Sequence, residues 1–171
     1  MDSKTFVVQQ QSDCYRNGMS QFFRASVGAV IANSKGKVLA LERSDTPGAW
    51  QFPQGGIDDH EEPLAAALRE VQEETGITPE SLSLIRRHPH LLSYELPPEW
   101  RTPKVGRGQT QRWFLFRFLP STDLIPLPTP GEFRQWRWMH LHDLMPLVAD
   151  FRQEIYQALA REFIEIGNGR W

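Results

Sequence analysis

The fold is decided by GGIDDHEEPLAAALREVQEETGI, residues 55–77. Its central part, residues 63–75, predicts a helix, because Pro63 suits a first helical turn and Gly76 stands where a left-handed C-terminal cap would fall. With about 100° of rotation per residue, apolar side chains recur on one face. These side chains are Leu64, Ala67, Leu68 and Val71. The segment is therefore expected to pack on a sheet as an amphipathic helix.

Three glutamates share the adjoining face of this predicted helix: Glu70, Glu73 and Glu74. Like charges at this spacing destabilise an isolated helix by about 0.2–0.5 kcal/mol per pair, so the arrangement needs a compensating cation. Carboxylate oxygens select Mg²⁺ or Mn²⁺, which also bind phosphate oxygens. Such a cation neutralises a polyphosphate and lowers the pKa of a bound water. A solvated acidic face is the commoner explanation of a charge run, and the neighbouring residues decide against it.

These neighbours follow a fixed pattern. In order they are Gly55, five residues, Glu61, seven residues, Arg69-Glu70-Val71, one residue, Glu73-Glu74, one residue and Gly76-Ile77. The pattern resembles the Nudix box at every defined position. The resemblance implies an α/β protein with the Nudix fold, an α/β/α sandwich with a mixed central sheet. It also implies a divalent-metal enzyme that cuts a phosphoanhydride bond.

The resemblance also assigns roles within the box. Glu70, Glu73 and Glu74 would bind the metal, and a backbone carbonyl at Gly55 would join them. Arg69 and Glu61 would brace the helix, while Gly55, Glu61 and Gly76 shape the box. In this family the base that activates water is sometimes a box glutamate and sometimes a carboxylate from a distant loop. Both alternatives stay open for this chain.

Stretches outside the box narrow the resemblance to RNA 5′-pyrophosphohydrolases and dinucleoside polyphosphate hydrolases. They are WQFPQGGI at 50–57, YELP at 94–97, GQTQRWFLFRF at 108–118, EFRQWRW at 132–138 and FRQEIY at 151–156. On this resemblance Glu132 is a loop carboxylate that reaches the metals and the preferred base outside the helix. Substrate would be bound by Arg24, Gln54, Tyr94, Phe151 and Arg152.

Two of these positions depart from the subfamily pattern. Arg24 lies in FRASVG, where a Tyr-Arg-Pro-Asn-Val-Gly stretch is common, and Arg152 replaces a common lysine. A substrate role for Tyr94 is favoured over one for Phe151, because Phe151 also belongs to an apolar stripe on the last predicted helix. A basic cluster accompanies the loop after YELPPEW and could follow RNA phosphates. Its members are Arg101, Lys104, Arg107 and Arg112.

The remaining sequence predicts strands and loops around the box helix. Strands are expected at 25–32, 37–41, 82–87, 91–96, 112–119 and 134–139, with a hairpin turn at 33–36. Residues 97–108 and 120–131 read as long loops, and an apolar stripe from Phe151 to Phe163 predicts a final helix. Residues 1–22 are expected to form an arm of uncertain order, and residues 23–171 the Nudix domain. Paired histidines, 88 with 90 and 140 with 142, are interpreted as structural rather than zinc-binding.

Composition limits the partners and the compartment. The 171 residues carry a net charge of −2, which gives no global attraction to nucleic acid. The single cysteine, Cys14, and the absence of a signal or membrane-spanning stretch favour the cytoplasm. We expect no DNA, membrane or obligate protein partner. The leading substrates are 5′-triphosphorylated RNA and diadenosine polyphosphates. Free nucleoside triphosphates, nucleotide sugars and a non-catalytic nucleotide- or RNA-binding module are the alternatives.

Overall fold

The computed structural model describes residues 22–128 and 131–163. The prediction about the arm therefore lies outside the described residues, except at Phe22. Within this part of the chain no helix is long and apolar enough to cross a membrane.

One mixed sheet of eight strands organises the described residues. The strands are β1 (Phe23–Ala32), β2 (Val38–Arg43), β3 (Trp50–Gln51), β4 (Gln54–Gly56), β5 (Leu82–Arg87), β6 (Leu92–Glu95), β7 (Gly108–Phe118) and β8 (Phe133–Met139). The main order is β3-β2-β1-β7-β5, and β4, β6 and β8 pair with β1, β7 and β2. β1 and β7 run parallel over ten residue pairs, while the other pairs are antiparallel. The predicted mixed sheet is confirmed.

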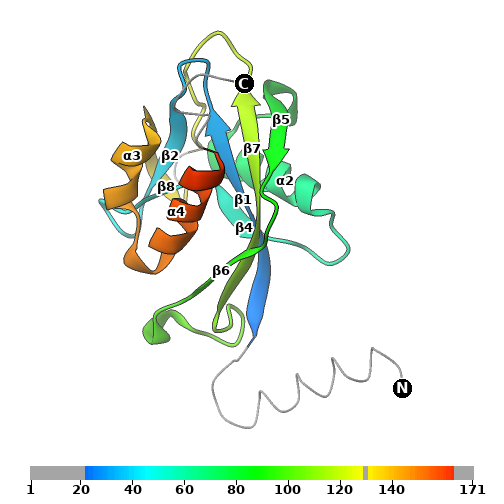
Figure 1. Cartoon of the computed structure of the whole chain (residues 1–171), viewed down its shortest axis with the longest axis vertical. Coiled ribbons are helices and arrows are strands. Elements are labelled where there is room, and N and C mark those ends of the chain that lie inside the picture. The colour runs from blue at the N-terminus through cyan, green and yellow to red at the C-terminus, as the bar shows by residue number, and fades with distance from the viewer. Residues whose placement is uncertain (1–21, 129–130, 164–171) are drawn as a thin grey trace.

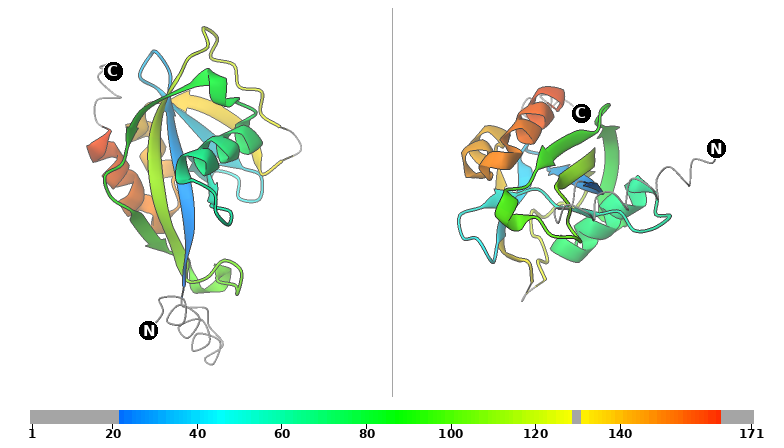
Figure 2. Two further views of the ribbon diagram at one scale, coloured as in Figure 1. Left: turned by 90° about the vertical axis from the view of Figure 1, so that its right-hand side faces the viewer. Right: turned by 90° about the horizontal axis from the view of Figure 1, so that it is seen from below.

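Helices cover both faces of this sheet (Figure 1). The box helix α2 (Pro63–Thr75) lies on one face, and α3 (Leu141–Leu144) and α4 (Gln153–Glu162) lie on the other, as Figure 2 shows from the side. Side chains alternate along each strand, so Trp113 packs in the core beneath α4 and Phe114 in the core beneath α2. The fold class predicted from the sequence, an α/β/α sandwich, is confirmed.

The box helix has the predicted bounds, with Pro63 in its first turn. Gly76 caps its C-terminus at φ 74°, and the Gly76 N–H donates to the Gln72 carbonyl at 2.9 Å. The apolar side is shifted slightly from the prediction. Ala66, Ala67, Val71 and Thr75 are buried, whereas Leu64 and Leu68 pack at the edge of the core.

Three differences from the expected elements concern polar or very short segments. β7 begins four residues before the expected residue 112, because its polar start pairs with β1 on one side and β6 on the other. The short strands β3 and β4 were not predicted, since their pairing depends on β2 and β1 rather than on local pattern. The final helix begins at Gln153, and Phe151 lies in the 3-10 turn before it.

The segment that leads into the box is held from both sides. β4 pairs with β1, and the Ala29 N–H donates to the Pro53 carbonyl at 2.9 Å. From α4, the buried hydroxyl of Tyr156 accepts the Phe52 N–H at 2.7 Å, and the two rings stack 4.8 Å apart. Burial raises the pKa of Tyr156, so the hydroxyl stays neutral. The last helix therefore fixes the entry to the box.

Replacing Tyr156 by Phe should lower the free energy of unfolding by about 1–3 kcal/mol, because the buried Phe52 N–H loses its acceptor. Denaturant unfolding measures this loss. Tyr94→Phe is the matched control, since the Tyr94 hydroxyl accepts only a long 3.5 Å hydrogen bond from Arg152. Equal losses in the two variants would contradict the assigned role of Tyr156.

Candidate active site

The box glutamates lie along one side of α2 but in different environments. The side chain of Glu73 is 59% exposed, whereas that of Glu70 is only 15% exposed. Burial raises the pKa of Glu70, against the opposing effect of a hydrogen bond from Arg69. Burial, and next the charge of Glu132, raise the pKa of Glu74 well above its ordinary value. Ionised carboxylates are thus held where their charge is unfavourable without a cation.

Gly55 makes room for this arrangement. A Cβ atom at Gly55 would come within 2.0 Å of the Glu70 carboxyl carbon. The adjacent Gln54 N–H donates to Glu74 Oε2 at 3.1 Å. The backbone of β4 therefore contacts two box carboxylates directly, and a side chain at position 55 would displace one of them.

Arg69 braces the helix. Its guanidinium donates two hydrogen bonds of 2.8 Å to Glu61, one of 2.8 Å to Glu70 and one of 2.9 Å to the Gly56 carbonyl. Glu61 also accepts the Asp58 N–H at 3.0 Å. The hydrogen bonds from Arg69 lower the pKa of Glu61 to about 2. Arg69 and Glu61 thus join the loop before α2 to the helix itself.

Glu132 enters this region from the loop before β8. The Ser44 N–H donates to the Glu132 carbonyl at 2.8 Å, and Arg43 Nη1 donates to Glu132 Oε1 at 2.7 Å. The charge of Glu132 acts on Glu74, as the raised pKa of Glu74 reflects. Residues separated by 58 positions in the sequence are thus electrostatic neighbours.

The carboxylates fit a divalent cation in chemistry and in position. Hard oxygen donors converge where mutual repulsion and burial disfavour their charge, and Gly55 leaves the space they occupy. Within residues 22–128 and 131–163, however, no three acidic, histidine or cysteine side chains already enclose a cation. Arginines hold several of the donors instead: Arg69 binds Glu70 and Glu73, and Arg43 binds Glu132.

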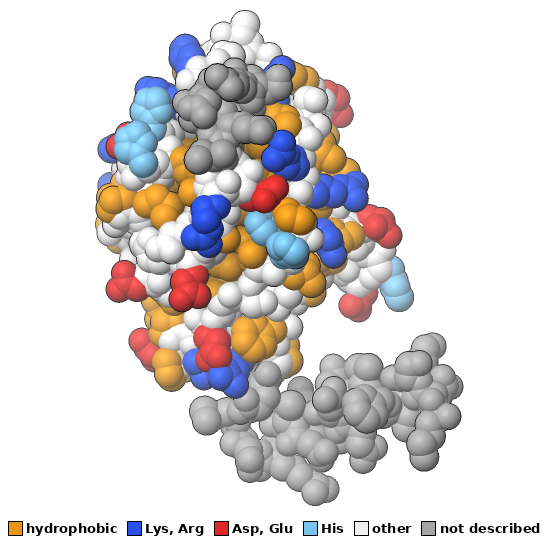
Figure 3. Space-filling view, viewed as in Figure 1, with side chains coloured by type: hydrophobic (Ala, Val, Ile, Leu, Met, Phe, Trp, Pro, Cys, Tyr) orange, Lys and Arg blue, Asp and Glu red, His pale blue; other side chains and the backbone are white. Residues whose placement is uncertain are grey.

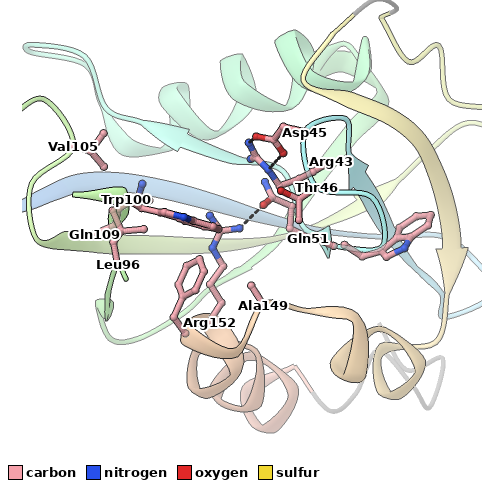
Figure 4. A pocket seen from close by; sticks show the side chains of 13 residues that line it. Arg43, Asp45, Thr46, Gln51, Leu96, Trp100, Val105, Gln109, Ala149 and Arg152 are labelled. Carbon is pink, nitrogen blue, oxygen red and sulfur yellow. Dashed lines mark hydrogen bonds and ion pairs between the residues drawn. The ribbon is translucent and has the colours of Figure 1, made fainter. Parts of the chain in front are cut away.

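A cavity of about 270 Å³ is joined to this cluster through Arg43, which lines the cavity and binds Glu132 (Figure 4 shows the cavity). Figure 4 shows Arg43, Asp45 and Thr46 on one wall and Arg152 and Ala149 on the wall that precedes α4. The remaining lining residues are Ala49, Trp50, Gln51, Leu96, Trp100, Val105, Gln109 and Phe151. The cavity combines guanidinium groups with aromatic rings. Such a surface can bind phosphates and stack on a base.

The predicted substrate residues are only partly brought together here. Phe151 and Arg152 line the cavity, and the Arg152 guanidinium lies 5.1 Å above the Phe151 ring and donates to Gln51. Tyr94 is 6% exposed and lies beneath Arg152, 5.4 Å from its guanidinium. Phe151 therefore lines the cavity while Tyr94 belongs to the core beneath it, and the substrate roles of both residues stay predictions.

Two further predicted residues lie closer to the box than to the cavity. Gln54 is buried, and its side-chain oxygen accepts a hydrogen bond from Gln111 at 3.1 Å. Arg24 lies against Gly56, where a Cβ would come within 2.0 Å of the guanidinium. Neither lines the cavity. Arg24 is positioned beside Glu70, whose pKa its charge helps to lower against the dominant effect of burial.

Sequence reasoning missed several lining residues. Trp100 stands in the 3-10 turn Pro98–Trp100, where its ring lies 5.4 Å from Phe151. Arg43 is the last residue of β2, and Gln109 is the second residue of β7. Trp100 falls within YELPPEW, so an aromatic residue in a long polar loop was an available signal. Nothing in the local pattern indicated Arg43 or Gln109.

Two members of the predicted basic cluster are paired with one glutamate. Arg101 and Arg107 both bind Glu95, at 3.3 and 2.6 Å. Arg112 alternates with Trp113 along β7 and so faces the α2 side of the sheet. Positive and negative side chains are interspersed on the face in Figure 3. His88 hydrogen-bonds to the His90 carbonyl at 2.9 Å, as a structural histidine would.

Solved structures share this architecture. An Ap4A hydrolase from C. elegans, in a binary complex, superposes with a TM-score of 0.64 at 24% identity and covers 82% of this chain and 98% of its own. The dihydroneopterin triphosphate pyrophosphohydrolase of E. coli gives a TM-score of 0.68 at 26% identity, covering 85% of this chain and 99% of its own.

The sequence match is more specific. The NUDIX domain model matches residues 22–162, and the chain belongs to this family. Curated proteins called RNA pyrophosphohydrolase are 44% identical over 150 residues in Acidiphilium cryptum and 40% identical over 146 residues in Cereibacter sphaeroides. Both alignments cover 82% of this chain and 90% of the relative. The predicted class, a Nudix hydrolase of phosphoanhydride bonds, is confirmed, and hydrolases of this family depend on divalent metals.

Glu73→Gln and Glu74→Gln should each lower kcat with Mg²⁺ by at least about a hundredfold, because metal binding and stabilisation of transition-state charge are both lost. Steady-state hydrolysis of a triphosphorylated oligonucleotide measures the effect. Gln72→Glu, on the exposed side of the same helix, is the control and should retain activity. Near-normal turnover of either Gln variant would exclude that glutamate as a metal ligand.

Without metal, Glu74→Gln should raise the thermal unfolding midpoint at neutral pH. The raised pKa of Glu74 means that its ionised form destabilises the fold above that pKa. The penalty disappears as the pH falls through the folded-state pKa toward the ordinary value of 4.5, so the two proteins should converge there. Calorimetry from neutral pH to the acid limit of stability tests this sign. A variant less stable at neutral pH would mean that Glu74 is structural.

Gly55→Ala should weaken Mn²⁺ binding by about tenfold or more, because the added methyl group meets the Glu70 carboxylate. Titration calorimetry gives the Kd. In a Glu70→Ala background the same change should cost little, since the clashing group is gone. An equal cost in both backgrounds would show that Gly55 acts through the backbone instead.

Proposed function

We propose that this protein hydrolyses the 5′-triphosphate end of RNA and releases pyrophosphate, with Mg²⁺ as the preferred cation. The proposal also places the enzyme in the cytoplasm. Its main support is a cavity whose walls carry Arg43, Arg152, Trp100 and Phe151, and whose Arg43 also binds Glu132. The names and the high coverage of the RNA pyrophosphohydrolase relatives point to the same substrate.

Each part of the substrate has a counterpart among the described residues. Arg43 and Arg152 offer guanidinium forks for phosphate oxygens, because both line the cavity. Phe151 and Trp100 pack edge to face and present rings on which a base can stack. Trp100 is 49% exposed, so a base can reach it without displacement of core residues.

The acidic helix supplies the chemistry next to this cavity. Glu70, Glu73 and Glu74 would hold the divalent cation, which neutralises phosphate charge and acidifies water when bound. Water then attacks one phosphorus of the chain, the phosphoanhydride bond breaks and pyrophosphate leaves. Glu132 or a box glutamate accepts the proton of the attacking water. Arg69 and Gly55 keep the helix and its carboxylates in position.

A diadenosine polyphosphate is the second candidate, because the same cavity could stack one adenine and the same carboxylates could bind the phosphate chain. The two candidates differ beyond the first nucleotide. RNA continues with further phosphates, whereas a dinucleoside polyphosphate does not.

The double change of Arg101 and Arg107 to Ala should weaken a triphosphorylated oligonucleotide much more than diadenosine tetraphosphate, if RNA phosphates reach this loop. For a single strand, the salt slope should fall by about 0.7 for every phosphate that the variant no longer binds. Binding and kcat/KM measured at several salt concentrations give both quantities.

Glu95→Gln is the matched control, because Glu95 binds both arginines. Its removal frees their charges and should tighten the oligonucleotide and steepen its salt slope. Equal responses of the two substrates, or no gain in kcat/KM beyond a dinucleotide RNA, would favour the diadenosine polyphosphate.

A further inference from the structure

Arg43 occupies a position between the cavity and the catalytic carboxylates. It ends β2 and lines the cavity, with its side chain 26% exposed. Its Nε and Nη2 atoms donate to the two oxygens of Asp45 at 2.8 and 2.6 Å, and Nη1 donates to Glu132 at 2.7 Å. One guanidinium therefore joins a carboxylate of the cavity wall to the loop carboxylate near Glu74.

The backbone around Arg43 is built to hold this position. The pairing of β2 with β8 changes register between Glu42 and Arg43, as in a β-bulge. Bulges commonly redirect a side chain beside an active site. The next residue, Ser44, fixes the backbone of the Glu132 loop through hydrogen bonds to the carbonyls of Glu132 and Gly131, at 2.8 and 3.0 Å. Ser44 thus holds the backbone of the loop, and the Glu132 side chain is held separately, by Arg43.

The Glu132 carboxylate is held by Arg43 rather than by the box. It is 51% exposed and bonded to Arg43, while its charge already acts on Glu74. To join the box, the Glu132 side chain must leave Arg43, while the hydrogen bonds from Ser44 to the loop backbone can stay in place.

A substrate phosphate is the natural competitor for Arg43. Arginine forms charge-assisted hydrogen bonds with phosphate and with carboxylate, and either pair can be bidentate. A polyphosphate that enters the cavity can therefore replace a carboxylate on Arg43. Asp45 holds the guanidinium through Nε and Nη2, whereas Glu132 is bound through one atom, Nη1. Glu132 is therefore the carboxylate that is released more easily.

We propose that Arg43 is a positioning residue that retains Glu132 until substrate phosphate binds Arg43, so that the loop carboxylate joins the box carboxylates only when substrate is present. The inference rests on the proposed function, because it takes the box as the metal site. In this proposal the loop before β8 completes the metal site only when substrate is bound. Asp45 keeps Arg43 at the cavity wall throughout.

A double-mutant cycle on Mn²⁺ affinity tests this inference in the full-length protein without substrate. Arg43→Gln should tighten Mn²⁺ binding by about tenfold, because Glu132 becomes free to join the site. In a Glu132→Gln background the gain should shrink to about twofold or less, which is the general effect of removing one screened positive charge. Calorimetric titration and Mn²⁺ electron paramagnetic resonance both report the Kd.

Asp45→Asn provides a second variant with the opposite sign. Arg43 then has Glu132 as its remaining carboxylate partner, so Mn²⁺ should bind more weakly than in the wild type. The weakening should exceed about twofold only when Glu132 is present, since a loss of up to about twofold is the general effect of one screened charge. A variant that merely disturbed the fold would not give opposite signs for Arg43→Gln and Asp45→Asn. For a triphosphorylated oligonucleotide, Arg43→Gln should raise KM more than it lowers kcat.

Equal tightening by Arg43→Gln in the two backgrounds would overturn the inference and leave the proposed function intact. So would unchanged Mn²⁺ affinity in Arg43→Gln when the variant retains the unfolding midpoint of the wild type. If Glu74→Gln also leaves Mn²⁺ affinity unchanged, the box is not the metal site, and the inference and the proposed function both fail.

Discussion

The structure depends on holding several like charges together on one helix. Glu70 and Glu74 are partly withdrawn from water, which is unfavourable for ionised carboxylates. Arg69 offsets part of this desolvation cost, because its guanidinium donates hydrogen bonds to Glu61, Glu70 and the Gly56 carbonyl. The rest of the site follows from this constraint. β4 must approach the helix closely, and a residue without a side chain is required at position 55.

The mixed sheet supplies the rigidity that such an approach needs. β1 and β7 form a long parallel pair at its centre, and alternate side chains of β7 enter the two cores. Trp113 fills one core so completely that a Cβ on Gly28 would lie 2.4 Å from its ring. Arg43 and Glu132 meet outside these two cores, where both side chains are partly exposed.

The sequence predicted those features that local pattern or motif determines. The box helix and its glycine cap were predicted with the correct bounds, and the spacing of the acids indicated hydrolase chemistry. Prediction failed where distant segments decide the outcome. β3 and β4 exist only through their partners, and Arg43 reaches the site through an irregularity between β2 and β8. Two of the four arginine and lysine residues in the predicted basic cluster are bound by one glutamate, which linear spacing could not reveal.

The hydrogen bond between the Phe52 N–H and the Tyr156 hydroxyl has a consequence for synthesis of the protein. A growing chain that has left the ribosome as far as β8 already contains every box carboxylate, but it lacks the anchor for the segment that enters the box. The same missing stretch carries Phe151 and Arg152, which line the cavity. Domains generally fold as units during synthesis, and the N-terminal part of the chain emerges first. A chain that stops before α4 would therefore keep the acidic motif but lack the anchor of Phe52 and two residues of the cavity wall.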